Sequence, residues 1–112
     1  MKPQGLLSEL ELLLLLTIVN LGEGAYGVPI AREVAEHRGH PVSIAGVYST
    51  LDRLEAAGLV ASVLGEATPE RGGRAKRYFR VTRRGLRAVH DTRRVLTKLW
   101  KSLPALNAKE PA

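Results

Sequence analysis

The sequence predicts a mainly α-helical fold with one small β-hairpin. Three observations lead to this prediction. Apolar residues recur at helical spacing, serine or threonine precedes these segments at helix-start positions, and one glycine-rich segment separates two short strand-like runs. The chain of 112 residues is long enough for one domain with one modest core. A hydrophobic share of 45% is typical of a globular chain rather than a disordered one.

Residues 8–20 predict the first helix. Ser8 and Glu11 have the spacing of a capping box, in which each side chain bonds the backbone N–H of the other residue. Apolar residues surround this helix almost completely, so one small core cannot cover it and a second subunit could. The stretch 6–21 is interrupted by polar residues and is shorter than the roughly 20 apolar residues that span a bilayer. We therefore interpret it as a buried helix rather than a signal peptide or a membrane span.

Two further helices are predicted before the hairpin. Pro29 suits the first turn of the second helix, and Pro41 prevents its continuation. Ser43 is the N-cap candidate of a third helix that ends at residue 57, with Gly58 just beyond its end. The predicted inward face of the third helix consists of Ile44, Val47, Leu51 and Leu54.

Residues 59–64 and 76–81 predict two strands, and the segment between them is longer than a two-residue turn. Thr82 is the N-cap candidate of a fourth helix, which Pro104 ends. This order predicts a winged helix-turn-helix domain over residues 1–82 and a C-terminal dimerisation helix over residues 83–104. The tail, residues 105–112, is predicted to be disordered.

The charge is distributed unevenly along a chain whose net charge is +6. Residues 1–70 hold four basic and nine acidic side chains, whereas residues 71–101 hold twelve basic ones and a single acid, Asp91. A short basic segment on a mildly acidic body indicates one surface that faces an anion, either nucleic acid or an anionic membrane. Cysteine is absent, which excludes disulfides and thiol chemistry and fits the cytoplasm, where we expect the protein to lie.

The third helix and the hairpin are the candidates for binding double-stranded DNA. The major groove admits one α-helix, and the start of the third helix exposes small and polar residues, Thr50 among them. Glycines let a hairpin backbone approach the phosphates, which arginines neutralise. The predicted DNA contacts are Ser43, Ala45, Gly46, Tyr48, Ser49 and Arg53 on the helix, and Arg71, Gly72, Gly73, Arg74, Lys76 and Arg77 on the hairpin. The alternatives are that Tyr48 packs against the hairpin and that the hairpin is an ordinary solvated loop.

The fourth helix is basic on one side and apolar on the other. A membrane-surface helix would share this pattern, but the first helix also needs an outside partner, which favours a homodimer. The predicted dimer interface consists of Leu10, Leu13, Leu14, Leu86, Val89, Leu96, Leu99, Trp100 and Leu103. Trp100 could instead line a pocket for a small-molecule effector between the subunits.

No other chemistry is indicated by the sequence. The three histidines lack metal-ligand spacing, so we expect no metal site and no cofactor. No catalytic triad, phosphate-binding loop or paired catalytic carboxylates can be identified, and an enzyme is not expected. A protein-interaction module that uses the acidic N-terminal half remains the main alternative to DNA binding.

Taken together, these residues resemble the PadR-like transcriptional regulators. The resemblance lies in residues 10–16, in Ala25-Tyr26-Gly27 with Ile30, in the run VYSTLDRLE at 47–55 with GLV at 58–60, and in RGGRAKRYF at 71–79 with Val81, Thr82 and Gly85. It implies a winged helix domain whose third helix enters the major groove, a wing at the DNA backbone or minor groove, and dimerisation through the first and last helices. The single C-terminal helix is similar to the short-tailed branch, in which many members are repressors and some respond to aromatic effectors.

Overall fold

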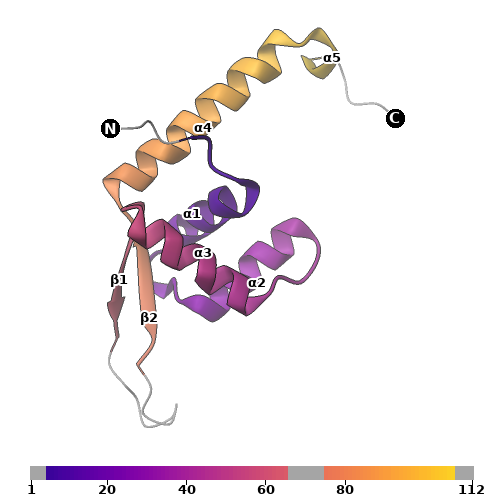
Figure 1. Ribbon diagram of the computed structural model, residues 1–112. Coiled ribbons are helices and arrows are strands. Elements are labelled where there is room, and N and C mark those ends of the chain that lie inside the picture. Colours follow the sequence, from indigo (N-terminus) through magenta and orange to yellow (C-terminus); the bar gives the residue numbers. More distant parts are fainter. Residues whose placement is uncertain (1–4, 66–74, 108–112) are drawn as a thin grey trace.

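The computed structural model describes residues 5–65 and 75–107, and in these ranges the order of elements agrees with the sequence prediction. Three helices come first, then an antiparallel hairpin, and then a long helix that leaves the body of the molecule (Figure 1). The four predicted DNA contacts Arg71, Gly72, Gly73 and Arg74 lie outside the described residues.

Helix α1, Glu9–Leu21, begins with the predicted capping box. Ser8 Oγ accepts a hydrogen bond from the Glu11 N–H at 3.2 Å, and the Ser8 N–H donates to Glu11 Oε1 at 2.8 Å. A short 3₁₀ helix, Gly22–Gly24, follows directly. Leu14, Leu15 and Ile18 are buried in the core, whereas Leu16 and Val19 are about half exposed. The apolar surplus predicted for this helix is therefore real, and part of it remains uncovered in a single chain.

Helices α2, Gly27–Arg38, and α3, Ile44–Ala56, form the helix-turn-helix unit. Val47, Leu51 and Leu54 of α3 point into the core as predicted. The prediction was wrong for Ile44, which is 47% exposed because it occupies the first helical position, beyond the reach of the core. Gly58, with φ of 79°, allows the chain to turn sharply from α3 into the hairpin.

Strands β1, Val60–Leu64, and β2, Arg77–Val81, pair antiparallel from Val60 opposite Val81 to Leu64 opposite Arg77. A β-bridge between Tyr26 and Tyr78 adds the segment before α2 to the edge of β2. The Phe79 N–H donates to the Ala25 carbonyl oxygen at 2.8 Å in the same region. The sequence indicated only a turn here, so the pairing of this segment with β2 was not predicted.

Helix α4, Arg83–Ser102, starts at the N-cap Thr82. Gly85, Ala88 and Thr92 are its buried residues, and its C-terminal half projects past α1, α2 and α3 (Figure 1). A short helix α5, Pro104–Asn107, follows, although the sequence predicted a disordered tail from residue 105. Within the described ranges, none of the helices combines the length and apolarity needed to cross a membrane.

The close approach of α4 to β1 requires glycine at position 85. A Cβ there would collide with the Leu59 carbonyl oxygen and lie 2.7 Å from Val81 Cγ1. Leu59 is buried, and its carbonyl oxygen belongs to the backbone and cannot move aside. We therefore expect Gly85→Ala to lower the free energy of unfolding by about 1–3 kcal/mol or more. Chemical denaturation measures this loss.

Gly24→Ala is the matched control, because a Cβ at Gly24 would meet no heavy atom within 4 Å. Its effect should stay within about 0.5 kcal/mol. Equal stabilities for the two variants would contradict the close packing described at Gly85.

Candidate nucleic-acid interface

The start of α3 presents the small side chains that the sequence predicted. Ala45 and Ser49, four residues apart, lie on the same exposed face of the helix. Ser43 is the N-cap, and its Oγ accepts a hydrogen bond from the Gly46 N–H at 3.1 Å. Arg53 lies one turn beyond Ser49 and is exposed. These side chains leave a low surface that another molecule can approach closely.

Thr50 was expected on this exposed surface and does not belong to it. It is buried, and its hydroxyl donates to the Gly46 carbonyl oxygen at 2.9 Å, one turn earlier in α3. Arg53 Nη2 lies 3.4 Å from the same hydroxyl. Thr50 therefore supports the helix from its inner side.

Tyr48 connects α3 to α2. Its ring is partly buried, and it lies so close to Gly27 that a Cβ at Gly27 would collide with the phenol oxygen. The hairpin packing that we considered for Tyr48 is thus replaced by packing on the first residue of α2. This contact fixes how α3 lies on α2, and it leaves a DNA contact by Tyr48 as a prediction.

Lys76 and Arg77 are the predicted hairpin DNA contacts that the structure describes, and both have partners within the chain. Lys76 Nζ lies 4.1 Å from the centre of the Tyr26 ring, close enough for a cation–π interaction. Tyr26 in turn meets Tyr78 edge to face, with ring centres 5.5 Å apart. Lys76 therefore stands at the junction of β2 with the segment that leads into α2.

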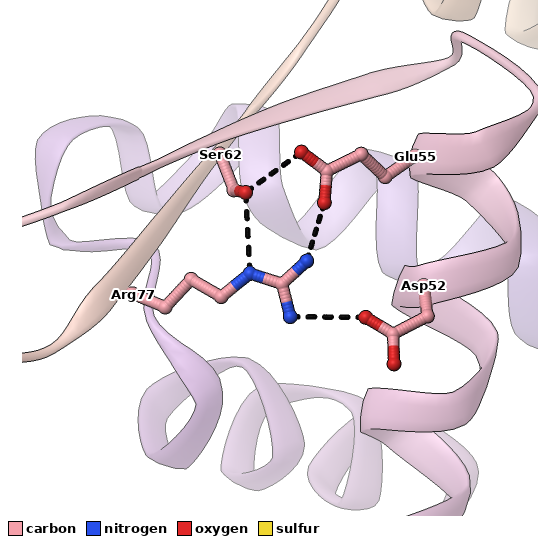
Figure 2. A network of polar contacts seen from close by, with 4 residues as sticks. All are labelled: Asp52, Glu55, Ser62 and Arg77. Carbon is pink, nitrogen blue, oxygen red and sulfur yellow. Dashed lines mark hydrogen bonds and ion pairs between the residues drawn. The ribbon is translucent and has the colours of Figure 1, made fainter.

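The side chain of Arg77, which is 32% exposed, is bound by residues of α3 and β1, and a DNA contact by Arg77 stays a prediction. Its Nη1 donates to Asp52 Oδ1 at 2.9 Å, its Nη2 donates to Glu55 Oε1, and its Nε donates to Ser62 Oγ at 3.1 Å (Figure 2). The Ser62 hydroxyl donates to the second Glu55 oxygen at 2.8 Å. The guanidinium thus binds protein carboxylates.

The charges in this network stabilise one another. Hydrogen bonds from Ser62 and Arg77 lower the pKa of Glu55 below its usual value of 4.5. Partial burial acts against the charge of Arg77, but hydrogen bonds to Asp52 and Glu55 outweigh it and raise the pKa of the guanidinium. Both shifts favour the charged forms of Glu55 and Arg77. The spacing of Asp52 and Glu55, three residues apart on one helix, was the sequence signal that could have revealed the network.

The residues predicted for the dimer interface fall into three groups by exposure. Leu14 is fully buried in the core of its own chain and is corrected to a core residue. Leu10, Leu13 and Val89 are partly buried against that core. The remaining five are exposed: Leu86, Leu96, Leu99, Trp100 and Leu103.

An apolar groove of about 600 Å³ lies between the end of α1, the outer face of the hairpin and the start of α4. Val19, Val63, Val81 and Leu86 contribute to its walls. The sequence did not predict this groove. Trp100, the predicted effector residue, does not line it. Within the described ranges, no three histidine or carboxylate side chains come together as a metal site would require.

Glu55→Gln should destabilise the protein in a pH-dependent way. The folded state lowers the pKa of Glu55, so its contribution is complete above pH 4.5 and is lost as the pH falls through the lower folded value. We expect the unfolding free energies of wild type and variant to differ most at about pH 7, and the difference to shrink as the pH falls below 4.5.

Denaturant titrations across this pH range measure this difference. Glu36→Gln serves as the control, since Glu36 is exposed on α2 and has no ion pair or hydrogen bond to the described residues. A difference that stays constant with pH would show that the carboxylate charge is not what stabilises the network.

Comparison with known proteins identifies the family. The profile of the Transcriptional regulator PadR-like family matches residues 15–91. The transcriptional regulator Rv3488 of Mycobacterium tuberculosis is 38% identical over 78 residues, which cover 70% of this chain and 68% of that protein.

Solved structures agree in fold. A PadR family transcriptional regulator from Eggerthella lenta superposes with a TM-score of 0.65 at 28% identity, covering 88% of this chain and 83% of that one. A PadR-like transcriptional regulator from Bacillus cereus reaches a TM-score of 0.70 at 22% identity, covering 90% and 93%. The winged helix with its C-terminal helix is shared by these proteins, and the chain belongs to the PadR-like family of transcriptional regulators.

Proposed function

We propose that this protein binds a pseudo-palindromic DNA operator as a homodimer and represses transcription. The observation that carries the proposal is the exposed first half of α3, where Ala45 and Ser49 form a low surface beside the hairpin. A major groove about 12 Å wide admits a helix of this kind, and hydroxyls and small apolar groups can contact phosphates and base edges. Arg53, one turn further along, is within the reach of a phosphate or a guanine.

The charge distribution supports an anionic partner. Nine arginines and three lysines lie in residues 71–101 against one acid, although the chain as a whole carries only +6. Such a concentration of charge speeds the encounter with DNA and contributes affinity that does not depend on sequence. Base contacts from α3 would then supply the specificity.

The projecting half of α4 supports a homodimer. Leu96, Leu99 and Leu103 continue the side of the helix on which Ala88 and Thr92 are buried, yet all three are about half exposed. Trp100, 58% exposed, lies beside them. A second copy brings an identical apolar face, and two-fold pairing covers both faces at once. The partly exposed side of α1 lies on the same body and would add to this interface.

In such a dimer two α3 helices enter successive major grooves about 34 Å apart, and the operator repeats the two-fold symmetry of the protein. We assign repression because a dimer bound across two grooves obstructs other proteins at the same site. A small molecule that changes the angle between the two α4 helices would shift this spacing and weaken DNA binding.

DNA binding should depend steeply on salt. A dimer that neutralises about six to ten phosphates loses about a thousandfold or more in affinity between about 50 and 200 mM salt. Arg53→Ala should make the slope shallower by about one for each Arg53 that contacts a phosphate. Fluorescence anisotropy with a duplex selected from a random pool measures both quantities, and a scrambled duplex of equal length is the control. A salt-independent affinity would refute the proposed mode of binding.

Leu99→Glu should separate the dimer. A carboxylate at this position would be buried without a partner in the α4 interface, and we expect the dimer Kd to rise about a hundredfold or more. Sedimentation equilibrium gives the oligomeric state. Thr97→Glu places the same charge on the polar side of the same helix and should leave the dimer intact. Dimers of unchanged stability with Leu99→Glu would exclude α4 as the interface.

A further inference from the structure

We infer that Arg77 is a positioning residue for DNA binding, which acts by fastening the hairpin to the recognition helix α3 through Asp52 and Glu55. This inference rests on the proposed function for its effect on DNA, whereas the fastening itself is a property of the free protein. It gives Arg77 a different role from that of a phosphate contact, and the two roles predict different measurements.

The geometry of the network requires an arginine. Three guanidinium nitrogens, Nη1, Nη2 and Nε, each donate to a different side chain, and the acceptors come from α3 and β1 (Figure 2). Asp52 and Glu55 lie on α3, and Ser62 lies in the middle of β1. A planar fork can serve three such acceptors at once, whereas a lysine ammonium concentrates its charge at one point. A lysine at position 77 would therefore keep the charge and lose most of the fastening.

The position of Arg77 near the far end of the hairpin explains how the network can hold the hairpin against α3. Leu59, Val60 and Phe79 anchor the base of the hairpin in the core. At the far end Val63 and Leu64 of β1 are 65% and 73% exposed, so burial does not hold this half. Arg77, the first residue of β2 and opposite Leu64, ties this end to α3. The Tyr26–Tyr78 bridge ties β2 to the segment before α2, and Arg77 adds the tie from this end of the hairpin to α3.

The charges lead to a test that separates the two roles. Asp52 is exposed and Glu55 partly exposed on α3, the helix proposed to approach phosphates. A carboxylate that merely lies near DNA repels it, so neutralising such a group ordinarily strengthens binding. Removing the Glu55 charge would instead release one anchor of Arg77 and let the hairpin swing. Positioning therefore predicts weaker binding where simple repulsion predicts tighter binding.

The experiment compares Glu55→Gln, Arg77→Lys and Arg80→Gln in the full-length chain. Arg80 lies three residues from Arg77 on the same strand and is exposed, and its side chain makes no ion pair or hydrogen bond with the described residues. Arg80→Gln therefore serves as the control, because it shows how much DNA affinity is lost when one cation is removed from this strand. Affinity for the selected duplex is measured across a salt series, and hydrogen exchange of the β1 and β2 amides is measured without DNA. Thermal unfolding followed by circular dichroism shows that each variant is folded.

We expect Glu55→Gln and Arg77→Lys each to weaken DNA binding about threefold to tenfold with the salt slope unchanged, because neither removes a phosphate contact. Amides at the far end of the hairpin should exchange faster in both variants and at the wild-type rate in Arg80→Gln. Tighter binding by Glu55→Gln, or unchanged exchange in both network variants, would overturn the inference. If the wild type binds no DNA, the proposed function fails, and the exchange data still decide whether Arg77 fastens the hairpin.

Discussion

The junction between the end of α3 and the start of α4 determines the orientation of every functional element. The Thr82 hydroxyl donates to the Gly58 carbonyl oxygen at 2.7 Å, and the Thr82 N–H donates to the Leu59 carbonyl oxygen at 3.0 Å. Gly85 packs directly against Leu59 at the same place. Within a few residues, therefore, α3 ends, both strands of the hairpin meet, and α4 begins. A disturbance at this point changes the angle of all three elements at once.

Sequence patterns predicted this fold well because its helix boundaries depend on local chemistry. The caps at Ser8, Ser43 and Thr82 each satisfy backbone N–H groups through a side chain that the sequence places directly before the helix. The strands followed from their composition and from the glycines between them. The β-bridge at Tyr26 escaped prediction because it joins residues far apart in the chain and leaves no periodic pattern. Helix α5 escaped because a single turn carries too few residues to show one.

The candidate site could be predicted only in part, and the errors share a cause. Thr50 was assigned to the surface by residue type and by position on a helix, but its hydroxyl has an internal partner that residue type does not reveal. The internal partners of Arg77 were missed for the same reason. Leu14 was counted as a contact between subunits because α1 is apolar on almost every side. Only the packing of the other elements decides which of those sides the chain covers by itself. Ile44 was placed inside by its spacing, which takes no account of where the core ends.

In the proposed dimer, the length of α4 would connect the reading of DNA to dimerisation. Its 20 residues extend about 30 Å, and only the first half is packed on the body. Since α3 and α4 are joined at one junction, a rotation of α4 in the proposed dimer would move α3 relative to the DNA. Under the inference drawn for Arg77, the hairpin would follow α3 through this side chain. The spacing of the half-sites would then be set at the dimer interface and the placement of the wing at Arg77, so that changes at either place alter DNA binding by different routes.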